Sequence, residues 1–203
     1  MQLTLVRHGQ TAWNALGRFQ GHRDIALSEE GYRQAAAVAK ALASDPISAA
    51  FSSDLARASE TARIVISSHH IELQLDSRLR EFDFGSWEGL TWDEIVASDP
   101  QAAVRLRTSA RDYRPTGGES FAQVRLRLAS FLDDLQRSSF EYTLIVAHAG
   151  TLHALVGELL GERFDEVETV FSHGSISRLR WENGSARIIS LNDVAHLNPA
   201  RTS

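Results

Sequence analysis

The stretch LTLVRHG at residues 3–9 joins a short apolar run to a charged pair and a glycine. Such a run is typical of a buried strand in a parallel sheet that ends in a polar loop. We therefore predict a strand over residues 3–6 and place Arg7 and His8 at its carboxyl end.

The chain beyond this strand alternates between helical and extended patterns. Apolar residues at helical spacing predict helices at residues 28–45, 55–65, 121–135 and 151–160. Short apolar runs predict further strands at residues 47–51, 71–75 and 142–147. Side chains that can cap the first two helices are Ser28 for one and Ser52, Ser53 or Asp54 for the other. Strands and helices in alternation indicate an α/β fold with a parallel sheet.

Two segments depart from this alternation. Asn183-Gly184 separates apolar runs at residues 175–181 and 186–191, which predicts a hairpin and an antiparallel edge of the sheet. Residues 82–118 carry several aromatic side chains, a short helical pattern and an arginine-rich stretch. We interpret them as a largely helical cap inserted into a single domain that spans residues 1–203.

Composition narrows the class of protein. A chain of 203 residues with 43% hydrophobic content can bury a sizeable core, and it contains no cysteine for disulfides or thiolate chemistry. A net charge of -5 disfavours binding to nucleic acid. No apolar stretch approaches the length that spans a membrane. We expect a cytoplasmic protein with no nucleic-acid or membrane partner.

Charged side chains gather where three predicted strands end. Arg7 and His8 follow the first strand, Arg57 opens the helix after the second, and His148 follows the strand at 142–147. Open α/β sheets bind ligands at this edge. Two guanidinium groups and two imidazoles at one edge predict a phosphate site that needs no metal ion, because arginines can neutralise the phosphate oxygens. The same positive charges disfavour imidazolium and keep His8 nucleophilic.

When a phosphate ester is cleaved, the leaving alkoxide also needs a proton donor. Glu81 lies among aromatic residues, and Asp83 and Glu88 are close to it in the chain. Residue types and spacing alone do not choose among these three carboxyl groups.

Several blocks of the sequence together resemble the histidine phosphatase superfamily, in its phosphoglycerate mutase-like branch. The blocks occur in the order found in that family, over nearly the whole chain: LVRHGQT at 5–11, Asn14, GRFQG at 17–21, SSDLARA at 52–58, Glu81, GSWEG at 85–89 and VAHAG at 146–150. The resemblance implies a three-layer α/β/α sandwich with a helical insertion over the site. It implies no metal and no cofactor.

The resemblance also implies roles for the central residues. His8 is the nucleophile that becomes phosphohistidine. Arg7, Arg57 and His148 form the phosphate pocket around it. Glu81 is the proton donor and later activates water.

The resemblance also covers residues around this centre. The resemblance implies that Asn14 supports the phosphate pocket and that Gln20, Gly21 and Ala149 lie on the substrate side. Many relatives have glycine at position 149, arginine at 153 and asparagine at 173, where this chain has Ala149, His153 and His173. We expect the remaining histidines to be surface or packing residues, with rim roles left open for His22 and His153. The arginines of the cap are expected to be solvated, and a role in holding substrate stays open for Arg105, Arg107, Arg111 and Arg114.

The segment at residues 115–120, PTGGES, resembles that of the shorter phosphatases of the family. The Arg-Arg and tyrosine segment of cofactor-dependent phosphoglycerate mutases is absent from the sequence. We therefore expect hydrolysis of a small phosphomonoester, with a phosphoglycerate mutase as the alternative. A homodimer is left open.

Overall fold

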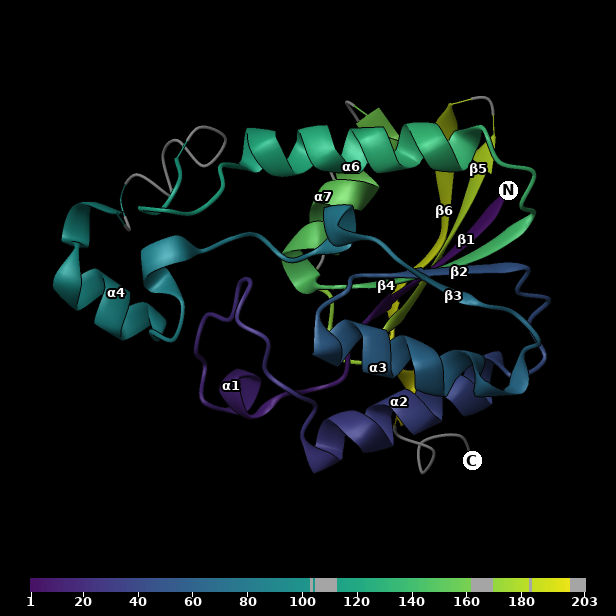
Figure 1. Cartoon of the computed structure of the whole chain (residues 1–203), viewed down its shortest axis with the longest axis horizontal. Coiled ribbons are helices and arrows are strands. Elements are labelled where there is room, and N and C mark those ends of the chain that lie inside the picture. The colour runs from purple at the N-terminus through teal and green to yellow at the C-terminus, as the bar shows by residue number, and fades with distance from the viewer. Residues whose placement is uncertain (103, 105–112, 162–169, 183, 198–203) are drawn as a thin grey trace.

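The sheet of this protein has six strands in the order β3-β2-β4-β1-β5-β6 (Figure 1). They are seen in a computed structural model that describes residues 1–102, 104, 113–161, 170–182 and 184–197. The strands are β1 (Gln2–Arg7), β2 (Ala49–Ser52), β3 (Leu73–Leu75), β4 (Tyr142–Ala147), β5 (Ile176–Glu182) and β6 (Ser185–Asp193). The four strands β3, β2, β4 and β1 are parallel, and β5 and β6 extend the sheet in antiparallel fashion.

Helices cover both faces of the sheet. The helices are α1 (Ala12–Ala15), α2 (Glu29–Leu42), α3 (Ala56–Val65), α4 (Trp92–Ser98), α6 (Phe121–Gln136) and α7 (Ala149–Leu160). Short 3-10 turns are η1 (Ile66–Ser68), η2 (Ser77–Leu79), η3 (Gly85–Trp87) and η5 (Ala195–Leu197). Helices α6 and α7 lie on one face, and α2 and α3 lie on the other (Figure 1). The predicted three-layer α/β fold is confirmed.

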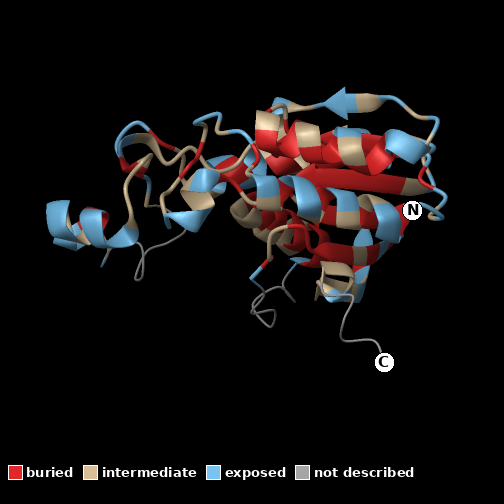
Figure 2. Cartoon of the chain, turned by 90° about the horizontal axis from the view of Figure 1, so that it is seen from below, coloured by how far each residue is buried: buried red, intermediate tan, exposed pale blue. Residues whose placement is uncertain are grey.

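The central strand β1 is buried on both faces, as its apolar run predicts. Leu3 and Leu5 pack into the core beneath α6 and α7, whereas Val6 packs into the core beneath α2 and α3. Successive side chains of a strand point to opposite faces, so one apolar run supplies both cores. Figure 2 shows the buried residues concentrated in the sheet and in the helix faces turned toward it.

The predicted hairpin joins β5 and β6. Glu182 pairs with Ser185, and Gly184 has a φ of +76°, a left-handed conformation that glycine adopts without strain. Asn183 lies outside the described residues. The antiparallel edge of the sheet therefore forms where the sequence predicts it.

One predicted helix cap is wrong. Helix α3 has Leu55 at its N-cap with no side-chain cap bond, whereas Ser52, Ser53 and Asp54 were the expected caps. The amide of Ala56 instead donates to Asp24 Oδ1, 2.7 Å away, from a distant loop. Asp54 pairs with Arg80, so its carboxylate is not available to the helix. Ser28 does cap α2, through a bond from the amide of Gly31.

The described residues of the segment at 82–118 stand to one side of the sheet and include η3 and α4 (Figure 1). The segment has a small core of its own, in which Trp87, Ile95 and Ala102 are buried against aromatic neighbours that include Phe19 and Phe84. Its arginines at 105, 107 and 111 lie outside the described residues, and Arg114 is exposed. Among the described helices, none combines the length and apolar character needed to cross a membrane.

Candidate active site

The carboxyl ends of three neighbouring strands bring the predicted residues together. In the parallel register, Arg7 of β1 is opposite Ala147 of β4, and Ser52 of β2 is opposite Val146 of β4. The chain continues from these ends into His8, His148 and the first turn of α3. As a result the ring centroids of His8 and His148 are 5.0 Å apart, and Arg57 Nε donates to His148 Nδ1 at 3.2 Å.

A cavity of about 280 Å³ opens at this edge. Most of the predicted site residues line it: Arg7, His8, Asn14, Gln20, Gly21, Arg57, Glu81 and Ala149. His148 is fully buried, at 0% exposure, beside His8. Phe19 and Phe84 add an aromatic wall on the side of the 82–118 segment.

The hydrogen bond of His8 defines its tautomer. Nδ1 of His8 lies 2.7 Å from the carbonyl oxygen of Gly9. A carbonyl only accepts, so Nδ1 carries the proton and the neutral ring has its lone pair on Nε2. Burial, Arg57 and Arg7 together hold the pKa of His8 well below its usual value. His8 is thus a neutral imidazole that lines the cavity with a free lone pair.

His148 has the opposite tautomer. Its Nδ1 accepts from Arg57 Nε, so the proton of the neutral ring is on Nε2. That Nε2 is buried and has no hydrogen-bond partner among the described residues. Burial, Arg57 and His8 lower the pKa of His148 well below its usual value. A buried donor without an acceptor costs free energy, which a bound oxyanion would recover.

Arg57 is held by the loop that precedes α2. Its Nη1 donates to the carbonyl of Arg23 and its Nη2 to the carbonyl of Gly21, both at 2.8 Å. The side chain is almost fully buried, and burial is the main cause of the lowered pKa of Arg57. Gly21 has a φ of +52°, and a Cβ there would lie 2.1 Å from Glu88 Oε1. The positive φ favours glycine at this point of the loop around the guanidinium.

Arg7 is held from the other side by the segment before β5. Its Nη1 donates to the carbonyl of Phe171 at 2.6 Å, and its Nη2 lies 2.7 Å from His173 Nε2. Burial lowers the pKa of Arg7 to about 10, so it stays charged. Burial and Arg7 lower the pKa of His173 to about 4, so His173 is a neutral acceptor at pH 7. His173, expected to be a surface or packing residue, thus also contacts a predicted site residue.

The three candidate carboxyl groups occupy different places. Glu81 lines the cavity, where it accepts from the amides of Gly150 at 3.1 Å and Thr151 at 3.0 Å, at the N-terminus of α7. Asp83 accepts from the amide of Gly85, and Glu88 accepts from the amide of His22. Neither Asp83 nor Glu88 is among the residues that line the cavity.

Thr11 connects the two predicted amide side chains. Its Oγ1 lies 3.0 Å from both Asn14 Oδ1 and Gln20 Oε1, and its amide donates to Asn14 Oδ1. The oxygen of Asn14 is therefore occupied, and its NH₂ group is the end available to a ligand. Thr11 is not among the site residues predicted from the sequence, although threonine is a preferred N-cap residue and Thr11 caps α1.

Two further residues hold the loop after His8. The amide of Gly9 donates to Thr61 Oγ1 at 3.1 Å, and this hydroxyl donates back to the carbonyl of Arg57. Gly31 of α2 crosses the same loop so closely that a Cβ there would lie 2.1 Å from the carbonyl oxygen of Gln10. Nothing in the residue types alone signals these contacts.

The fold and the site together describe an α/β protein that can bind a small oxyanion between two arginines, beside a neutral imidazole. Within the described residues, no group of three or more His, Asp or Glu side chains is arranged to hold a metal ion.

Comparison with known proteins agrees with this description. The family model of the histidine phosphatase superfamily (branch 1) matches residues 3–194. Phosphoserine phosphatase 1 of Hydrogenobacter thermophilus is 31% identical over 202 residues, covering 97% of this chain and 94% of that protein. A probable phosphoglycerate mutase of Yersinia pestis is 33% identical over 205 residues, covering 98% and 95%. This chain belongs to the histidine phosphatase superfamily.

A solved structure extends the match to three dimensions. A mycobacterial glucosyl-3-phosphoglycerate phosphatase in complex with VO3 superposes with a TM-score of 0.87 at 33% identity, covering 95% of this chain and 99% of that one. The family resemblance inferred from the sequence blocks is thus confirmed.

Proposed function

We propose that this protein is a phosphatase that transfers the phosphoryl group of a small phosphomonoester to Nε2 of His8 and then hydrolyses the phosphohistidine. The observation that carries the proposal is the pair of opposite tautomers in His8 and His148. One ring offers a lone pair for attack, and the other offers an N–H to a phosphoryl oxygen. Relatives that are named phosphatases support a hydrolase acting on phosphate esters.

In the first step, Nε2 of His8 attacks phosphorus and the bond from phosphorus to the ester oxygen breaks. The leaving oxygen takes a proton from Glu81, and Arg7, Arg57 and the Nε2–H of His148 bind the phosphoryl oxygens. The carboxyl group must be protonated for this step, which a neighbouring phosphate dianion favours.

In the second step, water attacks phosphorus of the phosphohistidine and the bond from phosphorus to nitrogen breaks. Glu81, now a carboxylate, takes the proton from the water, and phosphate leaves with the lone pair restored on His8. The amides of Gly150 and Thr151 hold this carboxylate at the cavity wall, ready to accept.

The test is release of phosphate from p-nitrophenyl phosphate, with rapid acid-free quenching and mass spectrometry to locate the phosphorylated residue. We expect phosphohistidine at His8 and no turnover in His8→Ala. Full activity in that variant would contradict the mechanism. Phosphoryl transfer that depends on 2,3-bisphosphoglycerate would favour the mutase alternative instead.

We further propose that the reaction needs no metal ion, because Arg7 and Arg57 already face the cavity as permanent cations. EDTA at millimolar concentration should leave the rate of p-nitrophenyl phosphate hydrolysis within about twofold of its starting value. Strong inhibition that added Mg²⁺ or Zn²⁺ reverses would contradict this part of the proposal.

A further inference from the structure

Glu81 lies in a part of the chain that has no regular backbone pairing. Residues 81–84 belong to no helix or strand, between η2 and η3. The position of such a segment depends on the groups that bond to it, since no ladder of backbone hydrogen bonds fixes it. The surroundings of this segment therefore decide where the carboxyl group of Glu81 lies.

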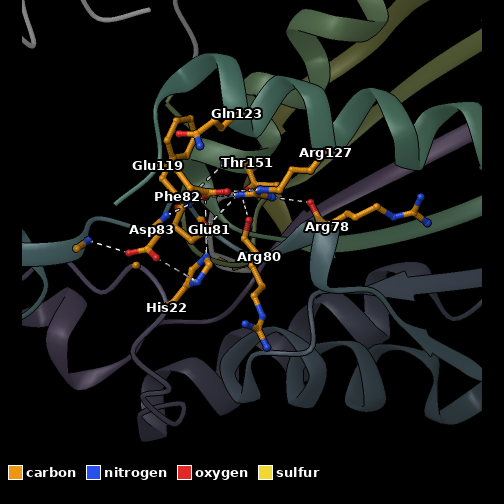
Figure 3. Close-up of polar contacts among 12 residues, drawn as sticks. His22, Arg78, Arg80, Glu81, Phe82, Asp83, Glu119, Gln123, Arg127 and Thr151 are labelled. Carbon is orange, nitrogen blue, oxygen red and sulfur yellow. Dashed lines mark hydrogen bonds and ion pairs between the residues drawn. The ribbon is translucent and has the colours of Figure 1, made fainter. Parts of the chain in front are cut away.

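Arg127 reaches this segment from α6. Its Nη1 donates to the carbonyl oxygen of Arg78 at 2.5 Å, and its Nη2 donates to the carbonyl oxygen of Glu81 at 3.0 Å. Its side chain is only 16% exposed. Figure 3 shows the guanidinium beside the Glu81 backbone, on the side toward α6. The Arg127 side chain thus bonds to the backbone at two points, Arg78 and Glu81.

Glu119 fixes Arg127 and extends the hold past Glu81. Nε of Arg127 donates to Glu119 Oε1 at 3.0 Å, and Nη2 donates to Oε2 at 3.1 Å. The same Oε2 accepts from the amide of Asp83 at 3.0 Å, and the amide of Glu119 donates to the carbonyl of Asp83 at 2.8 Å. The pair of Arg127 and Glu119 therefore bonds to the backbone on both sides of Glu81 (Figure 3).

The carboxylate end of Glu81 is held separately, by the amides at the start of α7. A Cβ at Gly150 would lie 2.8 Å from Glu81 Oε1, so the fit on that side is close. The backbone held by α6 and the carboxylate held by α7 together set the reach of Glu81 into the cavity. Arg127 makes four hydrogen bonds, to two carbonyls and to both oxygens of a carboxylate, whereas a lysine has only three N–H donors.

We infer that Arg127, clamped by Glu119, is a positioning residue for Glu81 and sets how well that carboxyl group protonates the leaving oxygen. Arg127 does not line the cavity, and its hydrogen bonds go to Glu119 and to the carbonyl oxygens of Arg78 and Glu81. The inference rests on the proposed function of Glu81. It predicts a defect in proton transfer with phosphate binding preserved.

The experiment compares Arg127→Met with Arg125→Met. Arg125 is on the same helix, is 47% exposed and pairs with Glu158 of α7, away from the Glu81 segment. The measured quantity is kcat/KM for aryl and alkyl phosphates whose leaving groups span a wide range of pKa. We expect Arg127→Met to slow alkyl phosphates at least about tenfold more than p-nitrophenyl phosphate, since only poor leaving groups depend on the proton. Arg125→Met should follow the wild type.

Phosphate inhibition gives the second measurement. The inhibition constant of inorganic phosphate should stay within about twofold in Arg127→Met, because no hydrogen bond of Arg127 goes to Arg7, Arg57, His8 or His148. Equal slowing of all substrates, or a large loss of phosphate affinity, would overturn the inference while leaving the phosphatase proposal intact. A wild-type protein without phosphatase activity would overturn the phosphatase proposal itself.

A double variant tests directly whether Arg127 acts through Glu81. If Arg127 acts through Glu81, adding Arg127→Met to Glu81→Gln should change kcat/KM for alkyl phosphates by less than about twofold. If the fold-losses of the two single variants multiply in the double variant, Arg127 acts independently of Glu81 and the inference is overturned. If Arg127→Met does not fold, Glu119→Gln can replace it, because it weakens the same clamp. Glu119→Gln should also slow alkyl phosphates more than p-nitrophenyl phosphate, by a smaller factor.

Discussion

The Nδ1 atoms of His8 and His148 have different hydrogen-bond partners, and this difference gives the two rings different roles in the proposed reaction. The carbonyl of Gly9 requires a proton on Nδ1 of His8, whereas Arg57 requires a lone pair on Nδ1 of His148. The remaining Nε2 atoms are therefore an acceptor in one ring and a donor in the other. If both rings had the same tautomer, the site would lack one of these functions.

His148→Ala removes the donor and keeps the nucleophile. We expect kcat/KM for p-nitrophenyl phosphate to fall by about 10²–10³, the usual cost of losing one preorganised donor to transition-state charge. Phosphohistidine should still form slowly at His8 and should be detectable by mass spectrometry. The exposed His70 provides the matched control, and His70→Ala should leave the rate unchanged. A loss in both variants would argue against a specific role for His148.

Glu81→Gln tests the proton donor. Because a good leaving group departs without a proton, this variant should slow alkyl phosphates at least about tenfold more than p-nitrophenyl phosphate. The measurement is a plot of kcat/KM against the pKa of the leaving alcohol, which should steepen. If the plot keeps its slope and Asp83→Asn steepens it, then Asp83 supplies the proton and our assignment is wrong.

For single residues, the sequence predicts contacts between the ends of neighbouring strands better than contacts made by residues of distant loops and helices. Strand ends placed Arg7, His8 and His148 together because parallel strands share their carboxyl edge. His173 and Arg127 reach the site from loops and helices whose placement depends on the complete packing. A lone histidine or arginine carries no local pattern that would reveal such a contact.

Among the elements, α2 has the closest contact with the loop after His8, the proposed nucleophile. Gly31 lies near the start of α2, and Gly9 packs against it so closely that a Cβ on Gly9 would lie 2.4 Å from the carbonyl oxygen of Gly31. Both partners in this contact are backbone atoms, which cannot rotate away as a side chain can. The helix and the loop can approach each other only because neither residue has a side chain.

Gly31→Ala should therefore push α2 away from the loop. We expect the free energy of unfolding to fall by about 1–3 kcal/mol, as in other overpacked sites, with a loss of activity because His8 is displaced. Urea unfolding and kcat/KM for p-nitrophenyl phosphate are the measurements. Arg33→Ala, on the exposed side of the same helix, should change neither by much. An unchanged Gly31→Ala protein would contradict the close contact.

The sequence predicts the positions of the helices more accurately than it predicts their ends. Apolar periodicity identifies α2, α3, α6 and α7 because each buries one stripe against the sheet. The start of α3 was misread because Ser52, Ser53 and Asp54 satisfy the local pattern of a cap, while the actual acceptor, Asp24, lies in a remote loop. Helix ends depend on such long-range donors and acceptors, which a local pattern does not contain.

For the whole molecule, buried neutral histidines predict how stability changes with pH. The pKa values of His8, His148 and His173 are all lowered in the folded protein, the last to about 4. The unfolded chain takes up these protons near pH 6.5, while the folded protein does not. Stability should therefore be constant above about pH 6.5 and should fall below it, by up to about 1.4 kcal/mol per pH unit for each such histidine.

Urea unfolding at pH 7, 5.5 and 4.5 measures this dependence. His173→Gln keeps a neutral acceptor for Arg7 and removes one titrating ring, so its midpoint should fall less steeply between pH 6.5 and pH 4.5. Asp54, whose pKa is lowered by Arg80, contributes only below its ordinary value of 3.8 and does not obscure this range. A wild-type midpoint that stays constant down to pH 4.5 would contradict the buried neutral state of these histidines.

The strand that carries Arg7 obtains both of its sheet neighbours from far along the chain: Gln2 pairs with Tyr142 on one side and with Arg180 on the other. During synthesis on the ribosome, His8 is made before residues 142–147 and 176–182, so the strand that precedes it has neither sheet neighbour until those segments have followed. Such long-range pairing is slow to form, because a large loop must close before any contact compensates for it. The proposed nucleophile is therefore made well before the two strands that complete the sheet beside it.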